Sequence, residues 1–214
     1  MTMNIFNTEA KKYDDWFDNH PDIYKSEIAA VRNALPTPHG RCVEIGIGTG
    51  RFATPFGIVD GVEPAQAMRT IAKSREINAI NGTAEKLPHE NESFDCALMV
   101  TTICFVDNPI QSCKEAWRVL KPDGTFIIGF VDRESFLGKL YESRKEKSPF
   151  YHNARFFSAQ EVANLMTTAG FLDLQFRQTL FHLPEDMKSS EPVLSGHGDG
   201  GFVVISGKKH EVCK

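Results

Sequence analysis

Long apolar runs, an excess of positive charge and paired cysteines are all missing from this sequence of 214 residues. No stretch approaches the roughly 18 consecutive apolar residues of a membrane-spanning helix, and residues 1–12 lack the apolar segment of a secretion signal. The formal net charge of −4 offers no attraction to the phosphate backbone of nucleic acids. We therefore expect a soluble protein that binds neither membranes nor nucleic acids.

Cysteine occurs five times, without the CxxC spacing that is typical of zinc sites. Cys42 and Cys96 fall within apolar segments, where a free thiol packs as a small hydrophobic group. An odd number of cysteines with no pairing pattern, Cys213 included, favours a reducing compartment. The sequence thus predicts a cytoplasmic protein that binds no metal.

Short apolar segments alternate with amphipathic ones along the chain. Strands are predicted over residues 41–45, 58–63, 78–82, 94–100, 125–131, 172–181 and 202–206. Helices are predicted over 8–35, in two pieces broken near His20-Pro21, and over 51–56, 64–74, 108–120, 132–148 and 158–170. Pro-Asp-Gly at 122–124 predicts a turn. This alternation is typical of a mostly parallel sheet with helices on both faces, and the last two strands predict an antiparallel hairpin at one edge. The expected fold class is α/β, with a single-domain, doubly wound sheet.

Three glycines spaced two apart follow the first predicted strand. Gly46, Gly48 and Gly50 can adopt positive φ and let the backbone approach a ligand closely. The dinucleotide fingerprint requires glycine at the first, third and sixth positions, but Arg51 occupies the sixth. Glu44, two residues before the first glycine, would repel a pyrophosphate and suit a ligand with a positive charge. The turn predicts a site for a nucleotide-like cation, and a tight turn without a ligand is the structural alternative.

This turn resembles the first motif of the class I S-adenosylmethionine-dependent methyltransferases, an acidic residue followed by G-x-G-x-G. Segments 62–64, 82–88 and 94–102 resemble this family in the same order, and segment 115–124 resembles its R-V-L-K-P-G-G signature. The resemblance implies a Rossmann-like fold that binds S-adenosylmethionine. In this family an acidic residue after the second strand accepts hydrogen bonds from the ribose hydroxyls, a role that falls on Glu63, followed by Pro64.

The other matches concern the adenine and methionine parts of the cofactor. Thr83, Ala84 and Glu85 match the family segment that reads the edges of adenine, although Thr83 replaces the usual aspartate. Thr101 and Thr102 follow the fourth strand, where family members place residues beside the methionine portion. Together with the glycine turn and Glu63, these residues form the expected cofactor site.

We expect one domain over residues 1–214, divided into four parts. They are an N-terminal helical cap (1–38), a cofactor-binding core (39–131), a helical insertion on the substrate side (132–157), and a helix with the terminal strand pair (158–214). The candidates for contact with the acceptor or for a general base are Tyr13, Asp132, His152, His182 and His197. Packing on the sheet is an equal alternative for Tyr13, and an ordinary surface position is the alternative for each histidine.

Methyl transfer needs little covalent chemistry from a protein that holds donor and acceptor in line, so no catalytic signature is expected. Residues 107–110, Asp-Asn-Pro-Ile, lack the second proline and the aromatic residue of the N-P-P-Y motif of nucleic-acid amino methyltransferases. We therefore expect a small-molecule acceptor; the acceptor atom and the oligomeric state stay open. Two other classes are considered: a non-catalytic, methyltransferase-like binding module, and a nicotinamide-dependent oxidoreductase, which Glu44 and Arg51 disfavour.

Overall fold

The computed structural model describes residues 2–210, so that Cys213 lies outside the described part. The strands are β1 (Cys42–Ile45), β2 (Asp60–Val62), β3 (Asn78–Ile80), β4 (Phe94–Val100), β5 (Leu120–Val131), β6 (Phe171–Thr179), β7 (Leu194–Ser195) and β8 (Phe202–Lys209). The α-helices are α1 (Thr2–Thr8), α2 (Ala10–Asn19), α3 (Pro21–Ala34), α4 (Gln66–Ser74), α5 (Pro109–Val119), α6 (Phe136–Arg144) and α7 (Ala159–Ala169). Short 3₁₀ turns are formed by Thr54–Phe56, Ile103–Phe105 and Lys145–Lys147.

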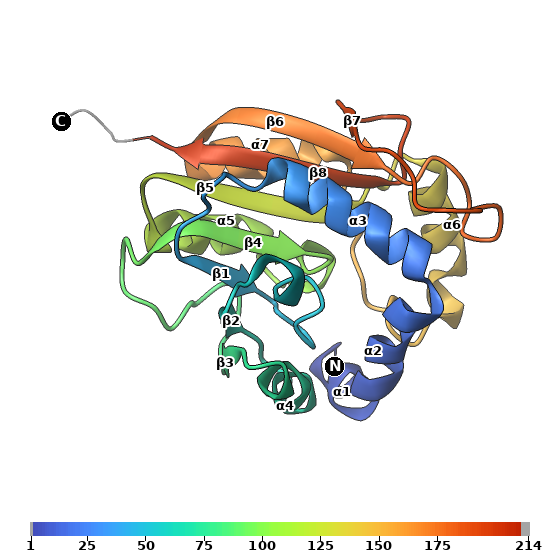
Figure 1. Cartoon of the computed structure of the whole chain (residues 1–214), viewed down its shortest axis with the longest axis horizontal. Helices are drawn as coiled ribbons and strands as arrows, with labels where there is room; N and C mark the ends of the chain where they lie inside the picture. The colour runs from blue at the N-terminus through green and yellow to red at the C-terminus, as the bar shows by residue number, and fades with distance from the viewer. Residues whose placement is uncertain (1, 211–214) are drawn as a thin grey trace.

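All of these strands belong to a single sheet, in the order β3-β2-β1-β4-β5-β8-β6-β7 (Figure 1). Neighbouring strands from β3 to β5 are parallel, whereas β8 is antiparallel to both β5 and β6. The predicted α/β class with antiparallel C-terminal strands is confirmed. One feature of the order was not predicted: the last strand along the chain lies inside the sheet, between β5 and β6.

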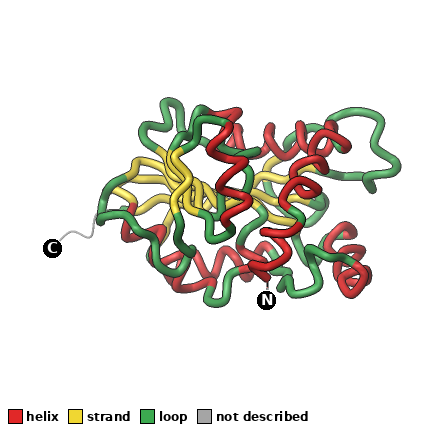
Figure 2. The backbone as a smooth tube through the Cα atoms, turned by 90° about the horizontal axis from the view of Figure 1, so that it is seen from below, coloured by secondary structure: helices red, strands yellow, loops and turns green. Residues whose placement is uncertain are grey.

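Helices cover both faces of the sheet (Figure 2). In β5 the side chains of Phe126 and Ile128 belong to the apolar cluster beneath α5 and α7, whereas Ile127 belongs to the cluster beneath α3. This alternation follows from the two-residue period of a strand, and it explains why the central strands are apolar on both faces. Among the helices of residues 2–210, none is long and apolar enough to cross a membrane.

The structure differs from two local predictions. Residues 122–124 form an irregularity within β5 rather than a turn before it, because Leu120 already pairs with Phe94 and the register shifts before Thr125 pairs with Cys96. Asp123 accommodates the extra residues with a φ of +60°. The helix predicted over 51–56 is reduced to turns and the 3₁₀ segment Thr54–Phe56, because Pro55 cannot donate a backbone hydrogen bond and Gly57 ends the segment at a φ of +68°.

Candidate functional site

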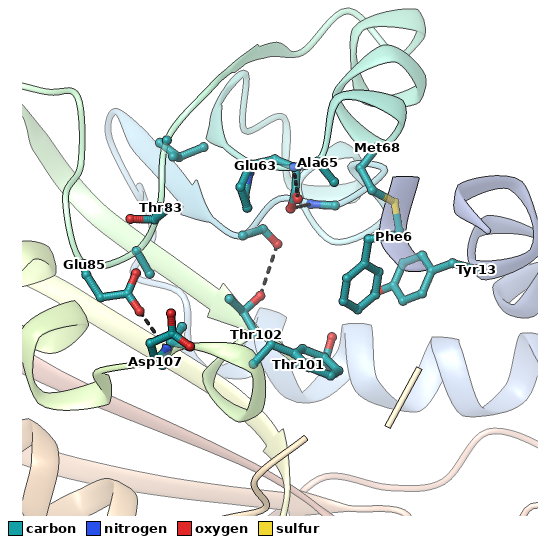
Figure 3. Close-up of a pocket in the computed structure, with 18 residues that line it drawn as sticks. Phe6, Tyr13, Glu63, Ala65, Met68, Thr83, Glu85, Thr101, Thr102 and Asp107 are labelled. Carbon is teal, nitrogen blue, oxygen red and sulfur yellow. Dashed lines mark hydrogen bonds between the residues drawn. The ribbon is translucent and has the colours of Figure 1, made fainter. Parts of the chain in front are cut away.

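A cavity of about 250 Å³ lies beyond the carboxyl ends of β1, β2 and β4. The strand order reverses between β1 and β4, which is where doubly wound sheets bind ligands. Figure 3 shows residues from α1, α2 and the strand ends converging on this space. All of the predicted cofactor residues except Glu44 and Gly50 line it: Gly46, Gly48, Glu63, Pro64, Thr83, Ala84, Glu85, Thr101 and Thr102.

The three glycines of the turn have different surroundings, although all have positive φ. A Cβ atom at Gly46 would lie 2.3 Å from Cγ2 of Thr102, and one at Gly50 would lie 2.4 Å from Cδ1 of Ile77. A Cβ atom at Gly48 would meet only Cε1 of Tyr13, at 3.8 Å across the cavity. Gly46 and Gly50 therefore permit close packing within the protein, whereas Gly48 keeps space open for a ligand.

Glu63 is held at the edge of the cavity by the backbone on both sides of it. The Gly48 N–H donates to Oε2 at 3.1 Å, and the Ala65 N–H donates to Oε1 at 2.8 Å. The side chain is only 8% exposed, and burial raises the pKa of Glu63, partly offset by these two hydrogen bonds. A carboxylate fixed in this way has lone pairs left to accept hydrogen bonds from two neighbouring hydroxyls.

Glu44 lies behind the glycine turn and is 1% exposed, so it does not line the cavity as a contact residue. The Ala53 N–H donates to its carboxylate, but Oε2 has no hydrogen-bond partner within residues 2–210. Burial raises the pKa of Glu44 well above its usual value. A cationic ligand beside the turn would favour the charged form of this carboxyl group, so the orphaned oxygen fits a ligand with positive charge.

The loops after β3 and β4 close the far side of the cavity. Oε1 of Glu85 accepts hydrogen bonds from the N–H groups of Asp107, at 2.9 Å, and Asn108, at 3.3 Å. The Glu85 carboxylate therefore braces the loop before α5. The Asp107 side chain lines the cavity together with Phe105. Neither residue was predicted, because both lie further along the segment between β4 and α5, beyond the strand end that identified Thr101 and Thr102.

Thr101 and Tyr13 lie close together at the carboxyl end of β4. Thr101 has a φ of +50°, which is unusual for a β-branched residue, and its N–H donates to the Gly129 carbonyl at 2.8 Å. Tyr13 shares a hydrogen bond with the Thr101 side chain, but burial is the larger effect and raises the pKa of Tyr13. Tyr13 is therefore a neutral phenol at physiological pH, suited to position a substrate rather than to remove a proton.

An ion-pair network fastens α2 to the glycine turn. Asp14 accepts hydrogen bonds from Arg51 at 2.8 Å and from Arg75 at 2.8 Å, and Arg51 also pairs with Asp18 at 2.7 Å. Burial alone would raise the pKa of Asp14, but the two arginines hold it below its usual range. Arg51, the residue that departs from the dinucleotide fingerprint, thus anchors the N-terminal helices over the cavity.

The other candidate acceptor-side residues lie away from the cavity lining. Asp132 is buried and accepts a hydrogen bond from the Glu134 N–H at 3.0 Å. His152 pairs with Glu146 at 3.3 Å, and His182 pairs with Glu191 at 2.5 Å, whereas His197 packs against the Phe176 ring. Of the five candidates, only Tyr13 is brought to the site. Within residues 2–210, no group of three or more His, Cys, Asp or Glu side chains could hold a metal ion.

The comparisons with known proteins define the class of the protein. Residues 43–128 match the family model described as a methyltransferase domain. A crystal structure from Thermotoga maritima, described as an S-adenosylmethionine-dependent methyltransferase and possible histamine N-methyltransferase, is 54% identical with a TM-score of 0.93. The match covers 96% of this chain and 99% of that one.

Two curated relatives extend the comparison. An uncharacterized protein of Methanocaldococcus jannaschii is 46% identical over 97% of this chain and 100% of its own length. The uncharacterized methyltransferase YodH of Bacillus subtilis is 30% identical over 79% of this chain and 74% of its own length. The chain belongs to the S-adenosylmethionine-dependent methyltransferases, and its cofactor is S-adenosylmethionine.

Proposed function

We propose that this methyltransferase acts on a small-molecule acceptor and that it accelerates the reaction chiefly by positioning. The observation that carries the proposal is the cavity between the glycine turn and the side chains of Phe6 and Tyr13. Of the three glycines of this turn, Gly48 is the one whose missing Cβ atom leaves space for a ligand. The short helices α1 and α2, which carry Phe6 and Tyr13, lie over this space and limit the size of an acceptor. The Thermotoga relative is described as a possible histamine N-methyltransferase, so amines are the first acceptors to screen.

The residues that would hold the cofactor are those already placed around the cavity. Glu63 would accept hydrogen bonds from the ribose hydroxyls, Gly48 would lie against the ligand, and Thr83 and Asp107 would face the adenine end. When bound, the cofactor supplies a methyl group on a sulfonium sulfur; the acceptor's lone pair forms the new bond to carbon while the carbon–sulfur electron pair stays with sulfur. Tyr13 would orient the acceptor and exclude water.

The proposed cofactor site is tested by isothermal titration of the purified protein with S-adenosylhomocysteine and, separately, with NADH. We expect S-adenosylhomocysteine to bind and NADH not to bind, because the Glu63 carboxyl group lies at the edge of the cavity beside the glycine turn, and because Arg51 occupies the sixth position of the dinucleotide fingerprint, where glycine is required. Methyl transfer to a panel of small amines, alcohols and thiols then tests the acceptor class. Binding of NADH alone would overturn the assignment.

The ribose role of Glu63 gives a second expected result. Glu63→Ala should weaken S-adenosylhomocysteine binding by about 1–3 kcal/mol, the effect of removing hydrogen bonds to a charged group. Glu90→Ala removes a carboxylate from an exposed position and serves as the control. If titration calorimetry gives the same dissociation constant for Glu63→Ala and for the unaltered protein, Glu63 serves only to hold the Gly48 and Ala65 backbone.

A further inference from the structure

Two cysteines and a histidine lie together at the amino end of β1, whereas the glycine turn follows its carboxyl end. Cys42 and Cys96 are partners in the parallel register of β1 and β4, and both belong to the apolar cluster beneath α3. Their side chains therefore leave the sheet on the same face. Neighbouring strands run about 4.7–4.9 Å apart, which falls within the roughly 4.4–6.8 Å that a disulfide requires between Cα atoms. Both thiols are free in the structure.

The His39 ring, three residues before Cys42, faces two carbonyl groups. Nδ1 lies 2.8 Å from the Gly40 carbonyl oxygen, and Nε2 lies 3.0 Å from the Phe56 carbonyl oxygen. Only the doubly protonated, positively charged ring can donate to both carbonyl groups at once. Burial alone would lower the pKa of His39, but these hydrogen bonds and the neighbouring Cys42 raise it. The fold thus favours an imidazolium group at this position.

The sulfur of Cys42 lies beside this ring. Sγ is 3.3 Å from Nδ1 of His39, and it is 3.4 Å from the His39 carbonyl oxygen, to which the thiol donates when it is protonated. A hydrogen bond from the Cys96 thiol lowers the pKa of Cys42, burial opposes this effect, and the charge of His39 lowers the pKa further. The same hydrogen bond and burial raise the pKa of Cys96. Asp95 also opposes ionisation of Cys42, but its carboxylate is paired with Lys121 at 2.9 Å.

A thiolate beside a cationic histidine is the nucleophilic form of cysteine, and a neighbouring thiol converts its first oxidation product into a disulfide. We propose that this cluster is an oxidation site for hydroperoxides, in which Cys42 is the nucleophile, His39 activates it and Cys96 resolves the product. Cys42 is 4% exposed and Cys96 is fully buried, so a small oxidant meets Cys42 first. Burial raises the pKa values of Cys104 and Cys113 to about 12, so these thiols stay protonated. The inference goes beyond the proposed methyl transfer and does not depend on it.

The reaction with hydrogen peroxide takes place in two steps. The Cys42 thiolate attacks one peroxide oxygen, the O–O bond breaks, and the leaving oxygen takes the proton of the His39 imidazolium and departs as water. Cys42 is then a sulfenic acid. The Cys96 sulfur attacks the Cys42 sulfur, the S–S bond forms as the S–O bond breaks, and the Cys96 proton leaves with the hydroxyl group as a second water. The two cysteines lose two electrons, which reduce one peroxide to two waters.

The test treats the reduced full chain with hydrogen peroxide, blocks the remaining thiols with N-ethylmaleimide in denaturant, and maps the unreduced peptides by mass spectrometry. We expect a disulfide between Cys42 and Cys96 that dithiothreitol reverses, with Cys104 and Cys113 still reduced. In Cys96→Ala, dimedone should instead trap a sulfenic acid at Cys42, and Cys42→Ala should give neither product. Cys113→Ala changes a buried cysteine on α5 and should react like the unaltered protein.

The rate of disulfide formation separates activation by His39 from the mere proximity of two thiols. His39→Gln should slow the reaction at pH 7 by at least about tenfold, because each unit of pKa changes the thiolate fraction about tenfold below the pKa. His152→Gln changes an exposed histidine and should leave the rate unchanged. An equal rate in His39→Gln and the unaltered protein would overturn the role of His39. A peroxide-treated chain in which Cys42 stays reduced, or pairs with a cysteine other than Cys96, would overturn the site itself, and this peptide map requires no substitution.

Discussion

Gly48→Val is expected to abolish binding of S-adenosylhomocysteine, with a loss of affinity of at least about a hundredfold, or roughly 2.7 kcal/mol. The Cβ atom would project into the cavity toward Tyr13, and the two methyl groups of valine would fill the space between the turn and that ring. The Gly48 N–H that donates to Glu63 would also be displaced, since a β-branched residue is strained at a φ of +53°. Isothermal titration measures the loss.

Backbone strain alone can be separated from occlusion of the cavity. Gly57 has a φ of +68°, and an added Cβ atom would meet nothing within 4 Å. Gly57→Val therefore introduces comparable strain outside the site, and it should lower the thermal stability while leaving the affinity for S-adenosylhomocysteine unchanged. If both variants lose stability but neither loses affinity, the cavity beside Gly48 is not where the cofactor lies.

Glu27→Gln is expected to stabilise the ligand-free protein, increasingly so as the pH rises. The unfolded chain ionises this carboxyl group near its ordinary pKa of 4.5, whereas the folded protein, which buries it on α3, keeps the proton until about pH 8. Between these two pH values the unfolded state binds fewer protons than the folded state. Glu27 therefore lowers the free energy of unfolding progressively as the pH rises, and this destabilisation reaches its full size above about pH 8. The difference in the free energy of unfolding between Glu27→Gln and the unaltered protein should reach a few kcal/mol, to order of magnitude.

Denaturant unfolding at pH 5 and pH 9 measures this difference. Four tyrosines whose hydroxyl groups are affected by the charge of Glu27 (Tyr13, Tyr24, Tyr141 and Tyr151) all have pKa values raised by burial, and the pKa values of Tyr24 and Tyr141 reach about 12. They therefore stay neutral across this interval. Asp22→Asn removes a carboxylate from an exposed position of the same helix, so it is the matched control and should show no growth of the difference with pH. An unchanged difference between pH 5 and pH 9 for Glu27→Gln would mean that water reaches the carboxyl group freely.

The strands and the site at their ends could be predicted because their signals are local. An apolar run broken by Gly46, Gly48 and Gly50 specifies both a buried strand and a turn, and Ser158 with Glu161 specifies a capping box, which the structure contains. The Asn108 side chain caps α5 in the same local manner by accepting from the Gln111 N–H. Each of these features depends on residues no more than a few positions apart.

What the sequence did not reveal depends on contacts between distant segments. Phe6 reaches the cavity because α1 packs beside α4, and no short-range pattern marks that contact. Glu27 looks like one polar residue within an amphipathic helix, and its burial appears only when α3 packs within the folded chain. The bulge at Asp123 arises because Leu120 pairs with Phe94 and Thr125 pairs with Cys96, so that β5 has more residues between these pairs than β4 has.

The position of β8 between β5 and β6 affects how the chain folds while it is being made. Residues Thr125–Val131 of β5 find their second pairing partner only in Phe202–Lys208, more than seventy positions later. A nascent chain that has emerged only through β6 therefore carries two strands with open edges and no strand between them to join them. Such edges are templates for aggregation and targets for chaperones. Completion of the sheet thus waits for the last strand, and a ribosome that pauses before residue 202 would leave the apolar centre of this enzyme unprotected.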